Sequence, residues 1–481
     1  MTSIPYANAA PHVGHILDPL IADVAARHHR MKGEAVRLLV GTDEHGAKIV
    51  RTAETQGITP QELVDENSER FRQMHRAVGI AADDFIRTSD AKRHWPGAQK
   101  LWRAAAASGD IYWKKYQGLY CVGHEAFITE KDLVEGICRD HQKAPEVIEE
   151  ENLFFRLSKY AARIEEAITS GRLLILPESR RHEALAFIRE GLDDVSVSRP
   201  RKDLSWGVPV PDDATQMIYV WFEALSSYLS SVGYGHEDAA SRETFAKWWP
   251  VDAQIIGKDN LRFHAIIWPG LLFSAGLELP RTIFVHGFVT VEGQKISKTV
   301  GNVISPDEVV AKYGSDPVRY YFLREFPAHE DGDFSYKKFE ERYNGDLANG
   351  LGNLVARVAT LGEKISPISL KDAFPDERPW SGIDASYDKK MREFRLNEAL
   401  GHVWGVISMG DKYINDRKPW AVSNEAELRG VIGNAAHLVG TVSRWLYPFL
   451  PETARKINEQ IDVGEKEIII KKGPHLFPRL D

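Results

Sequence analysis

The chain has only two cysteines, Cys121 and Cys138, in 481 residues, too few for a disulfide-stabilised scaffold. No apolar run has the length of a membrane-spanning helix, and the first residues lack the basic and then apolar stretch of a secretory signal. We therefore expect a cytoplasmic protein without a membrane partner. Basic residues are in deficit, because 61 Lys and Arg against 69 Asp and Glu give a formal net charge of -8. The net charge indicates no polyanion partner, although a local basic face on an acidic protein stays open.

A single hydrophobic core rarely grows beyond about 250–300 residues, so a chain of this length is expected to form two or three domains. The N-terminal part alternates between patterns of helix, over 16–32 and 58–79, and of strand, within 34–46 and over 85–90. This alternation predicts a parallel sheet, which binds ligands at the carboxyl ends of its strands. Residues from 110 to 215 are aromatic and turn-rich and predict an inserted domain. Long helical patterns at the C-terminal end predict a helical bundle.

The stretch PHVGH places His12 and His15 between a strand-like segment and the first predicted helix. A helix N-terminus favours anions because its amides and macrodipole are positive there, and two imidazoles add donors at the same point. Gly14 lets a planar group approach the backbone closely. On these residues alone, a solvent-facing histidine pair is an equal alternative.

A second stretch, GQKISKTVGN, holds Lys295 and Lys298 three residues apart in a loop between Gly293 and Gly301. Two ammonium groups that point the same way suit the negative charge of a phosphoryl or nucleotidyl transition state, where positioning and electrostatics dominate catalysis. Taken alone, a solvated lysine pair is the commoner explanation. Both stretches in one chain, each at a strand-to-helix turn, favour the functional interpretation.

PHVGH and KISKT resemble the HIGH and KMSKS signatures of the class I aminoacyl-tRNA synthetases. Further stretches resemble the methionyl-tRNA synthetase family in particular and follow one another in that family's order: SIPYANAAPHVGH, GTDEHG, YVWFEAL, IIGKDNLRFH and RKPW. The resemblance extends from residue 2 to the end of the chain, far beyond what a chance motif match covers.

The resemblance implies how the activation chemistry is distributed. It assigns catalysis of adenylation to the two signatures, with the histidines on the phosphates of ATP and the second signature closing over them as a mobile loop: His12, His15, Lys295, Ser297 and Lys298. It assigns further nucleotide contacts to Gly14, Gly257, Lys258 and Asp259. Mg²⁺ is expected together with ATP.

The same resemblance implies a pocket for the side chain of methionine, lined by Ile4, Tyr6, Val220, Trp221, Ala224, Tyr228 and His264. Asp43 would hold the ammonium group, since an α-amino group buried beside ATP needs a fixed anion. A thioether is polarizable and favours aromatic edges, so shape and either Tyr6 or His264 must discriminate the side chain. Without the resemblance, the stretch YVWFEALSSYL is better explained as an amphipathic core element.

The expected insertion contains a set of residues with zinc-knuckle spacing: Cys121, His124, Cys138 and His141. Two thiolates and two imidazoles complete a closed tetrahedral site, so a structural rather than a catalytic Zn²⁺ is expected. The family commonly has cysteine where this chain has His124. A knuckle held by packing without metal is the alternative.

Three residues of the C-terminal part are expected to recognise RNA: Asn353, Arg357 and Trp420. An exposed aromatic ring beside a guanidinium and an amide can stack one unpaired base and hydrogen-bond the edges of others. The resemblance assigns these three to the anticodon CAU. Trp420 as a core residue that caps the bundle is the alternative.

These observations predict an α/β fold with a Rossmann-like parallel-sheet catalytic domain, an inserted connective domain and a C-terminal α-helical anticodon-binding bundle. The expected boundaries are 1–109 and 216–285 for the two halves of the catalytic domain, 110–215 for the insertion with its knuckle at 116–145, 286–340 for the KMSKS loop and stem-contact region, and 341–481 for the bundle.

The resemblance implies a methionine–tRNA ligase that uses methionine, ATP and tRNA(Met), initiator tRNA included. Its rivals are a synthetase for another apolar amino acid, a tRNA-binding module without catalysis, and a small-molecule nucleotidyltransferase. An insertion of this size is too small for the knuckle plus an editing domain, which argues against the isoleucine, leucine and valine enzymes. The intact signatures argue against a tRNA-binding module without catalysis. The helical C-terminal part of the chain argues against a small-molecule nucleotidyltransferase. The family has a longer apolar strand before the residue that matches Tyr6, so either this strand is shortened here or the native start lies upstream of Met1. We also expect a monomer, because no further tRNA-binding domain follows the bundle.

Overall fold

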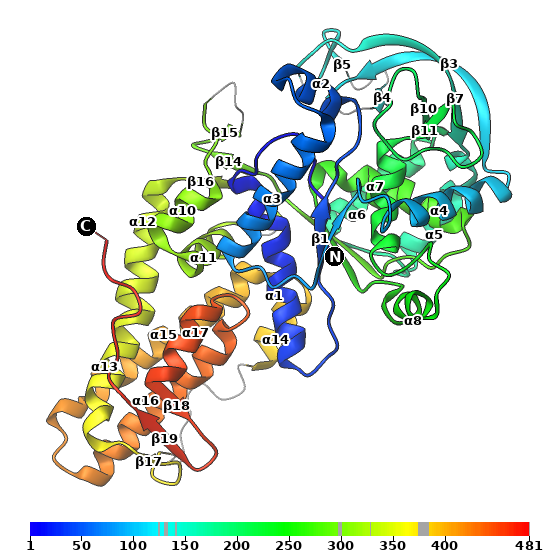
Figure 1. Ribbon diagram of the computed structural model, residues 1–481. Helices are drawn as coiled ribbons and strands as arrows, with labels where there is room; N and C mark the ends of the chain where they lie inside the picture. The colour runs from blue at the N-terminus through cyan, green and yellow to red at the C-terminus, as the bar shows by residue number, and fades with distance from the viewer. Residues whose placement is uncertain are drawn as a thin grey trace. The chain divides into compact units, whose positions relative to one another are not determined.

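The computed structural model describes residues 1–123, 126–128, 133–139, 142–296, 301–327, 329–373 and 384–480. The chain forms two compact units (Figure 1). Unit 1 consists of Met1–Pro11, Arg37–His75 and Ala81–Val285, and unit 2 of His12–Val36, Arg76–Ile80 and His286–Asp481. Among the described helices, none is both long and apolar enough to cross a membrane.

A parallel sheet organises unit 1. β1 (Leu39–Thr42) pairs in parallel with β2 (Asp84–Arg87), and β13 (Thr282–His286) pairs in parallel with β8 (Leu174–Leu176) on one side and borders β12 (Ala253–Gly257) on the other. The first residues connect the two groups of strands, because the amide of Thr2 donates to the carbonyl of Leu39 (3.2 Å) and that of Ser3 to the carbonyl of Ile255 (2.8 Å). The resulting order is β2, β1, residues 2–6, β12, β13 and β8, a doubly wound arrangement whose switch point is the N-terminal segment.

Helices α2 (Ala47–Gln56), α3 (Pro60–Val78), α4 (Trp95–Ala107) and α7 (Val220–Ser230) alternate with these strands along the chain. The order of β1, α3 and β2 confirms the strand and helix alternation predicted for the N-terminal part. All four residues of β1 are buried. A Cβ at Gly41 would lie 2.3 Å from the carbonyl oxygen of Ile86 on β2, so only glycine permits this pairing.

An antiparallel sheet follows in the range expected to be an insertion. Its order is β4 (Ala126–Ile128), β3 (Ile111–Cys121), β7 (Glu146–Phe155) and β9 (Val195–Ser196), and the long strands β3 and β7 run side by side (Figure 1). A hairpin of β5 (Leu133–Val134) and β6 (Ile137–Cys138) accompanies it, as does the pair β10 (Ser198–Pro200) and β11 (Gln216–Ile218). The same range also contains α5 (Ala161–Thr169), β8 and α6 (Glu178–Arg189). Since β8 pairs with β13, the parallel sheet takes one strand from within residues 110–215.

Unit 2 begins with the 3-10 turn η1 (Val13–Ile16) and α1 (Leu17–Met31). The helix predicted over 16–32 is confirmed, and Gly33 follows it with a positive φ of 77°, the left-handed conformation that commonly ends helices. The buried carboxylate of Asp23 on α1 accepts from the guanidinium of Arg319 (2.7 Å) on α11 (Ser315–Glu325). This ion pair holds α1 against the C-terminal helices.

The predicted C-terminal helices are present: α10 (Pro306–Tyr313), α12 (Tyr336–Arg342), α13 (Asn353–Gly362), α14 (Asp384–Arg392), α15 (Leu396–Arg417), α16 (Glu425–Leu446) and α17 (Pro451–Gln460). Two small sheets accompany them: β15 (Gln294–Lys295), β14 (Val289–Val291) and β16 (Gly332–Phe334), and then β17 (Ile368–Ser369), β19 (Glu467–Ile470) and β18 (Ile461–Val463). The second sheet departs from the helical expectation. Its cause is the run EIII of β19, whose isoleucines alternate between exposed and buried, the pattern of a half-buried strand.

Candidate active site

The first signature forms the N-terminal turn of unit 2, and its backbone holds both imidazole rings. The amide of Gly14 donates to Nδ1 of His12 (3.1 Å), and the amide of His12 donates to Nδ1 of His15 (3.0 Å). The two ring centroids lie 3.9 Å apart at an interplanar angle of 34°. Because each Nδ1 accepts a backbone hydrogen bond, the proton of each neutral ring is on Nε2. Each histidine therefore offers one N–H donor on the side of the ring away from the backbone.

Burial governs the charge of this pair. It lowers the pKa of His12 to about 4, and burial together with the neighbouring His12 lowers the pKa of His15 to about 3. Both rings are therefore neutral near pH 7. The donors anticipated from the sequence are uncharged N–H groups.

The second signature adjoins the first within unit 2. A Cβ on Gly14 would lie 3.3 Å from Cδ1 of Ile296, so the side chain of Ile296 covers this glycine. The amide of Val13 also donates to the carbonyl of Ile304 (3.0 Å). Two stretches some 280 residues apart in the sequence are thus brought together.

Lys295 ends the hairpin of β14 and β15, and its side chain is exposed. Its carbonyl accepts from the side-chain amide of Asn302 (3.1 Å), which closes the base of the loop. Ser297 and Lys298 lie outside the described residues.

Four of the residues expected to bind the amino acid and the nucleotide lie at the carboxyl ends of strands of unit 1. Asp43 comes directly after β1 and forms a parallel bridge with Tyr6, in which the amide of Asp43 donates to the carbonyl of Pro5 (2.9 Å). Gly257 ends β12, and Lys258 and Asp259 begin the 3-10 turn that follows. This is the edge at which a doubly wound sheet binds ligands.

Helix α7 and the segment 263–267 bring two residues of the expected pocket, Tyr228 and His264, into contact. The hydroxyl of Tyr228 lies 2.7 Å from Nε2 of His264, whose Nδ1 lies 3.0 Å from the carbonyl of Asn260. Since a carbonyl only accepts, Nδ1 of His264 donates to it and Nε2 accepts from Tyr228. The ring of Trp221 stacks on Phe263 at 3.5 Å between centroids.

The remaining members of this set are Ile4, Val220 and Ala224. Val220 and Ala224 are buried on α7, and Ile4 packs against the core of unit 1.

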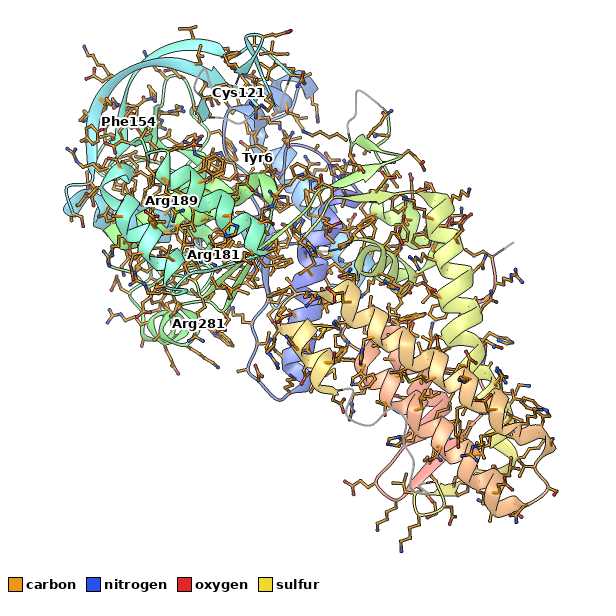
Figure 2. All side chains as sticks on the ribbon, turned by 180° about the vertical axis from the view of Figure 1, so that it is seen from behind. Tyr6, Cys121, Phe154, Arg181, Arg189 and Arg281 are labelled. Atoms are coloured by element: carbon orange, nitrogen blue, oxygen red, sulfur yellow. The ribbon has the colours of Figure 1, made fainter. Side chains whose placement is uncertain are left out.

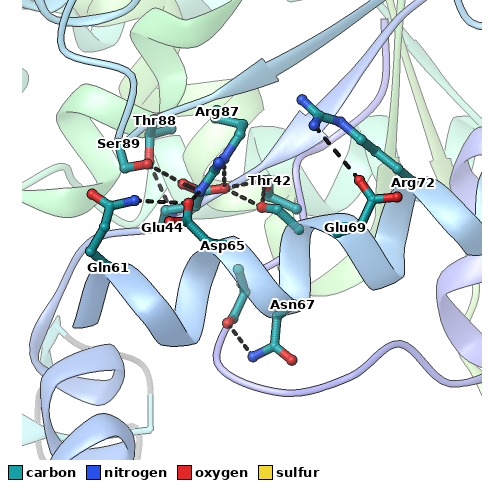
Figure 3. Close-up of polar contacts among 12 residues, drawn as sticks. Thr42, Glu44, Gln61, Asp65, Asn67, Glu69, Arg72, Arg87, Thr88 and Ser89 are labelled. Atoms are coloured by element: carbon teal, nitrogen blue, oxygen red, sulfur yellow. Dashed lines mark hydrogen bonds and ion pairs between the residues drawn. The ribbon is translucent and has the colours of Figure 1, made fainter. Parts of the chain in front are cut away.

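The loop that carries Asp43 is fixed by its neighbour Glu44, which the sequence interpretation did not single out. Its buried carboxylate accepts from Thr42 (2.6 Å), from Nε and Nη2 of Arg87 (2.8 and 2.9 Å) and from Ser89 (Figure 3). A buried carboxylate with this many donors is fully compensated. Glu44 therefore has a structural role beside the predicted ligand Asp43.

A second unassigned carboxylate, Glu223, lies buried between His45 and His94. Glu223 and His45 both fall within stretches singled out in the sequence, YVWFEAL and GTDEHG. The sequence signal that could have pointed to Glu223 is a charged residue within an apolar helical run. A buried charge is costly unless it is paired, so such a residue indicates a buried polar partner.

Two of the three residues expected to recognise RNA, Arg357 and Trp420, line an open pocket on α13 and the turn after α15. This pocket, the Trp420 surface, is lined by Ala356, Arg357, Thr360, Leu361 and Trp420. The Trp420 side chain is 58% exposed, so it is not a core residue. Its ring lies 5.9 Å from the guanidinium of Arg357, which donates to Asp411 (3.2 Å) and Asn415 (2.7 Å) on α15. Asn353 is exposed one turn earlier on α13.

The two cysteines of the expected knuckle belong to one small apolar cluster in unit 1. Cys121, labelled in Figure 2, ends β3, and Cys138 ends β6; both are buried with Ile128. His124 and His141 lie outside the described residues. Within the described residues, no three histidine, cysteine or acidic side chains gather as a metal site.

Comparison with known proteins identifies the family. The family model described as tRNA synthetases class I (M) matches residues 1–144 and 128–359. The chain is 39% identical to the methionine–tRNA ligase of Thermotoga maritima in an alignment 480 residues long, which covers 97% of this chain and 75% of that protein. It is also 39% identical to that of Brucella suis biovar 1 in an alignment 471 residues long, which covers 95% of this chain and 90% of that protein.

The fold agrees with this assignment. The crystal structure of Mycobacterium tuberculosis methionyl-tRNA synthetase bound by methionyl-adenylate superposes with a TM-score of 0.92 at 34% identity and covers 99% of both chains. The apo form of that enzyme gives a TM-score of 0.85 at 32% identity, over 100% of this chain and 97% of the other. The chain belongs to the class I tRNA synthetases of the M family, and the predicted fold class is confirmed.

Proposed function

We propose that this chain is a methionine–tRNA ligase, which activates methionine with ATP and transfers it to the 3′ end of tRNA(Met). The observation that carries this proposal is the likeness, in sequence and over the whole fold, to methionine–tRNA ligases, one of them solved with methionyl-adenylate. The juxtaposition of the two signatures in unit 2 supports it from the chain's own geometry.

The first reaction joins the substrates directly. A carboxylate oxygen of methionine attacks the α-phosphorus of ATP, the bond to the β-phosphate breaks, and pyrophosphate leaves. A hydroxyl of the terminal adenosine of tRNA then attacks the carbonyl carbon of the adenylate, and AMP leaves. No side-chain nucleophile is needed, so the protein contributes orientation and charge stabilisation.

The proposed roles follow the donors described above. The Nε2–H groups of His12 and His15 donate to phosphate oxygens as charge builds on them, and Lys295 supplies a positive charge from the adjoining loop, together with Ser297 and Lys298. Gly14 leaves room for the nucleotide. Gly257, Lys258 and Asp259 also contact it, and the carboxylate of Asp259 accepts from the ribose hydroxyls. Mg²⁺ enters as the ion bound to the phosphates of ATP.

The amino acid has its own set of contacts. Asp43 accepts from the ammonium group of methionine. The thioether lies among Ile4, Tyr6, Val220, Trp221, Ala224, Tyr228 and His264. Tyr228 is committed to His264, so these two groups present a fixed polar pattern to which a thioether, unlike a hydroxyl, makes no strong hydrogen bond.

Zn²⁺ is proposed as a structural ion of the knuckle. The buried cluster that joins Cys121 and Cys138 fits a pair of thiolate ligands, and His124 and His141 would complete the tetrahedron. When bound, the ion cross-links the hairpin of β5 and β6 to the end of β3.

The anticodon is the proposed ligand of the Trp420 surface. The exposed ring of Trp420 offers a face on which one base stacks. The guanidinium of Arg357 is held in place by Asp411 and Asn415, and Asn353 adds an amide. A preorganised donor loses less entropy on binding than a mobile one.

The deciding experiment is ATP–pyrophosphate exchange with the purified chain and each of methionine, leucine, isoleucine, valine and cysteine. Exchange with methionine alone is expected, followed by charging of tRNA(Met). Exchange with another of these amino acids but not with methionine would make the chain a synthetase for that amino acid. Exchange with none of them would overturn the catalytic assignment.

A further inference from the structure

Glu223 forms a buried chain of hydrogen bonds with two histidines of unit 1. Its Oε1 lies 2.9 Å from Nδ1 of His45 and its Oε2 lies 2.7 Å from Nε2 of His94. The exposed fraction of the side chain is 0% for Glu223, 2% for His45 and 0% for His94. Each carboxylate oxygen therefore has its own imidazole partner in an environment without solvent.

The hydrogen bonds from both histidines require an ionised carboxylate on Glu223. Burial alone would raise the pKa of Glu223, but the charge interaction and hydrogen bond from His45, and those from His94, outweigh it and hold this pKa below its ordinary value. A carboxylate only accepts, so Nδ1 of His45 and Nε2 of His94 both donate. A neutral amide could accept from only one of the two histidines.

The three residues come from three elements that carry or border the proposed methionine site. His45 lies two residues after Asp43 in the loop between β1 and α2. Glu223 lies on α7 between Trp221 and Ala224. His94 precedes α4, and its carbonyl accepts from the hydroxyl of Ser230 at the other end of α7 (3.1 Å).

The loop that carries Asp43 and His45 is anchored independently of α7. The hydroxyl of Tyr6 donates to the carbonyl of His45, and the backbone of Asp43 is paired with residues 5–7. The carboxylate of Glu44 fixes the same loop to Arg87. With the loop held to the sheet, the bond from Glu223 to His45 is a direct side-chain link between α7 and the loop that carries Asp43.

We infer that Glu223 is a positioning residue for methionine: through His45 it sets the spacing between the carboxylate of Asp43 and the α7 residues Trp221, Ala224 and Tyr228. The inference rests on the proposed function, because it concerns the spacing between the sites for the ammonium group and for the thioether. If the spacing between Asp43 and α7 is fixed at the length of methionine, the ammonium group and the thioether can bind at the same time. A loosened α7 would not hold this spacing.

The test compares two ligands that differ at one end. L-methionine has both the ammonium group and the thioether, whereas 4-(methylthio)butanoate lacks the amino group. In Glu223→Gln, isothermal titration is expected to show an affinity for L-methionine about 10- to 100-fold weaker, with that for 4-(methylthio)butanoate changed by less than about threefold. Glu223→Asp keeps the charge but shortens the reach, so the same pattern is expected with a smaller loss. It also serves as the variant to use if the glutamine substitution prevents folding.

A double-mutant cycle with Asp43→Asn separates positioning from general stability. If Glu223 acts through the placement of Asp43, Glu223→Gln is expected to cost little further affinity for L-methionine in the Asp43→Asn background. Asp110→Asn is the matched control. It neutralises another buried carboxylate of unit 1, which accepts from Lys159 and Ser274, and it is expected to leave the affinity for methionine unchanged.

Equal weakening of both ligands by Glu223→Gln, or additivity with Asp43→Asn, would overturn the inference and leave a purely structural glutamate. A wild-type chain that does not bind L-methionine at all would instead overturn the proposed function, and the inference with it. The two failures are distinguished by the wild-type titration alone.

Discussion

At the scale of single residues, the state of the signature histidines is set by backbone geometry and burial together. Each Nδ1 is occupied by an amide of the same turn, and burial keeps the rings neutral. Neutral N–H donors attract the ground state of ATP less than two cations would. Donors aimed at developing charge can therefore favour the transition state over bound substrate, which is the condition for a larger kcat.

The Nε2 donor of His15 can be removed while its Nδ1 acceptor is kept. In His15→Asn the shorter side chain still reaches the amide of His12 but ends before the position of Nε2. We expect kcat of methionine-dependent pyrophosphate exchange to fall by about 10²–10³-fold, with KM for methionine within about twofold of wild type. In His15→Gln, whose amide reaches further, part of the rate should return. Wild-type kcat in His15→Asn would contradict the assigned role.

The depressed pKa values also predict how stability depends on pH. Both histidines take up protons near the ordinary value of 6.5 in the unfolded chain, but only near 4 and 3 when folded. The unfolded state thus binds more protons below pH 6.5, and stability present above that pH is lost as pH falls toward 4. At pH 5 each histidine should contribute about 2 kcal/mol of this loss.

Thermal melting at pH 7.5 and pH 5 measures this dependence. We expect the double variant His12→Asn, His15→Asn to show a smaller decrease in Tm between the two pH values than wild type. An equal decrease in both proteins would mean that these rings are not held neutral by the fold.

At the scale of elements, contacts between the two signatures depend on a glycine. A Cβ at Gly14 would lie 2.9 Å from Cε1 of His12 and 3.3 Å from Cδ1 of Ile296. In Gly14→Ala the imidazole or the following loop must move, and we expect kcat of pyrophosphate exchange to fall at least about tenfold. Gly405→Ala is the control, since a Cβ there meets no atom within 4 Å. It should keep wild-type kcat, and equal rates in both variants would contradict the close packing at Gly14.

The knuckle makes a separate prediction. If Zn²⁺ is bound by the four proposed ligands, mass spectrometry of the purified chain should find about one zinc per chain, and Cys138→Ser should lose most of it. Because the ion cross-links strands outside the parallel sheet, pyrophosphate exchange assayed with Mg²⁺ in excess is expected to survive prior treatment of the protein with a zinc-selective chelator. Zinc-free wild-type protein from a zinc-supplemented culture would favour a knuckle held by packing.

Local patterns predicted the elements better than their pairing. Helix α1 and the alternation of β1, α3 and β2 could be read from periodicity and from Gly33, because these signals lie within one element. The partner of β8 could not be predicted in this way. Its pairing with β13 joins strands more than 100 residues apart, and a three-residue strand carries no local signal of such a partner. The partners of Glu223 could not be predicted either. Its motif YVWFEAL was recognised, but the histidines that bond it, His45 and His94, come from distant loops.

At the scale of the whole molecule, the two proposed recognition tasks are assigned to different parts of the chain. The family model ends at residue 359, so Trp420 lies beyond the matched range. Residues proposed for adenylation lie between positions 4 and 298, whereas the Trp420 surface uses α13 and the turn after α15. A substitution at Trp420 should therefore leave amino-acid activation intact.

Trp420→Ala tests this separation. Loss of one stacked base costs about 1–3 kcal/mol, so we expect kcat/KM for charging of tRNA(Met) to fall by about 10- to 100-fold, mostly through KM for tRNA, while pyrophosphate exchange stays at the wild-type rate. Trp420→Phe retains an aromatic face and should recover most of the charging rate. Met409→Ala removes another exposed apolar side chain, on α15, and should change neither reaction. Equal loss of exchange and charging in Trp420→Ala would mean that the residue supports the fold rather than the anticodon, because activation of methionine requires no tRNA contact in the proposed mechanism.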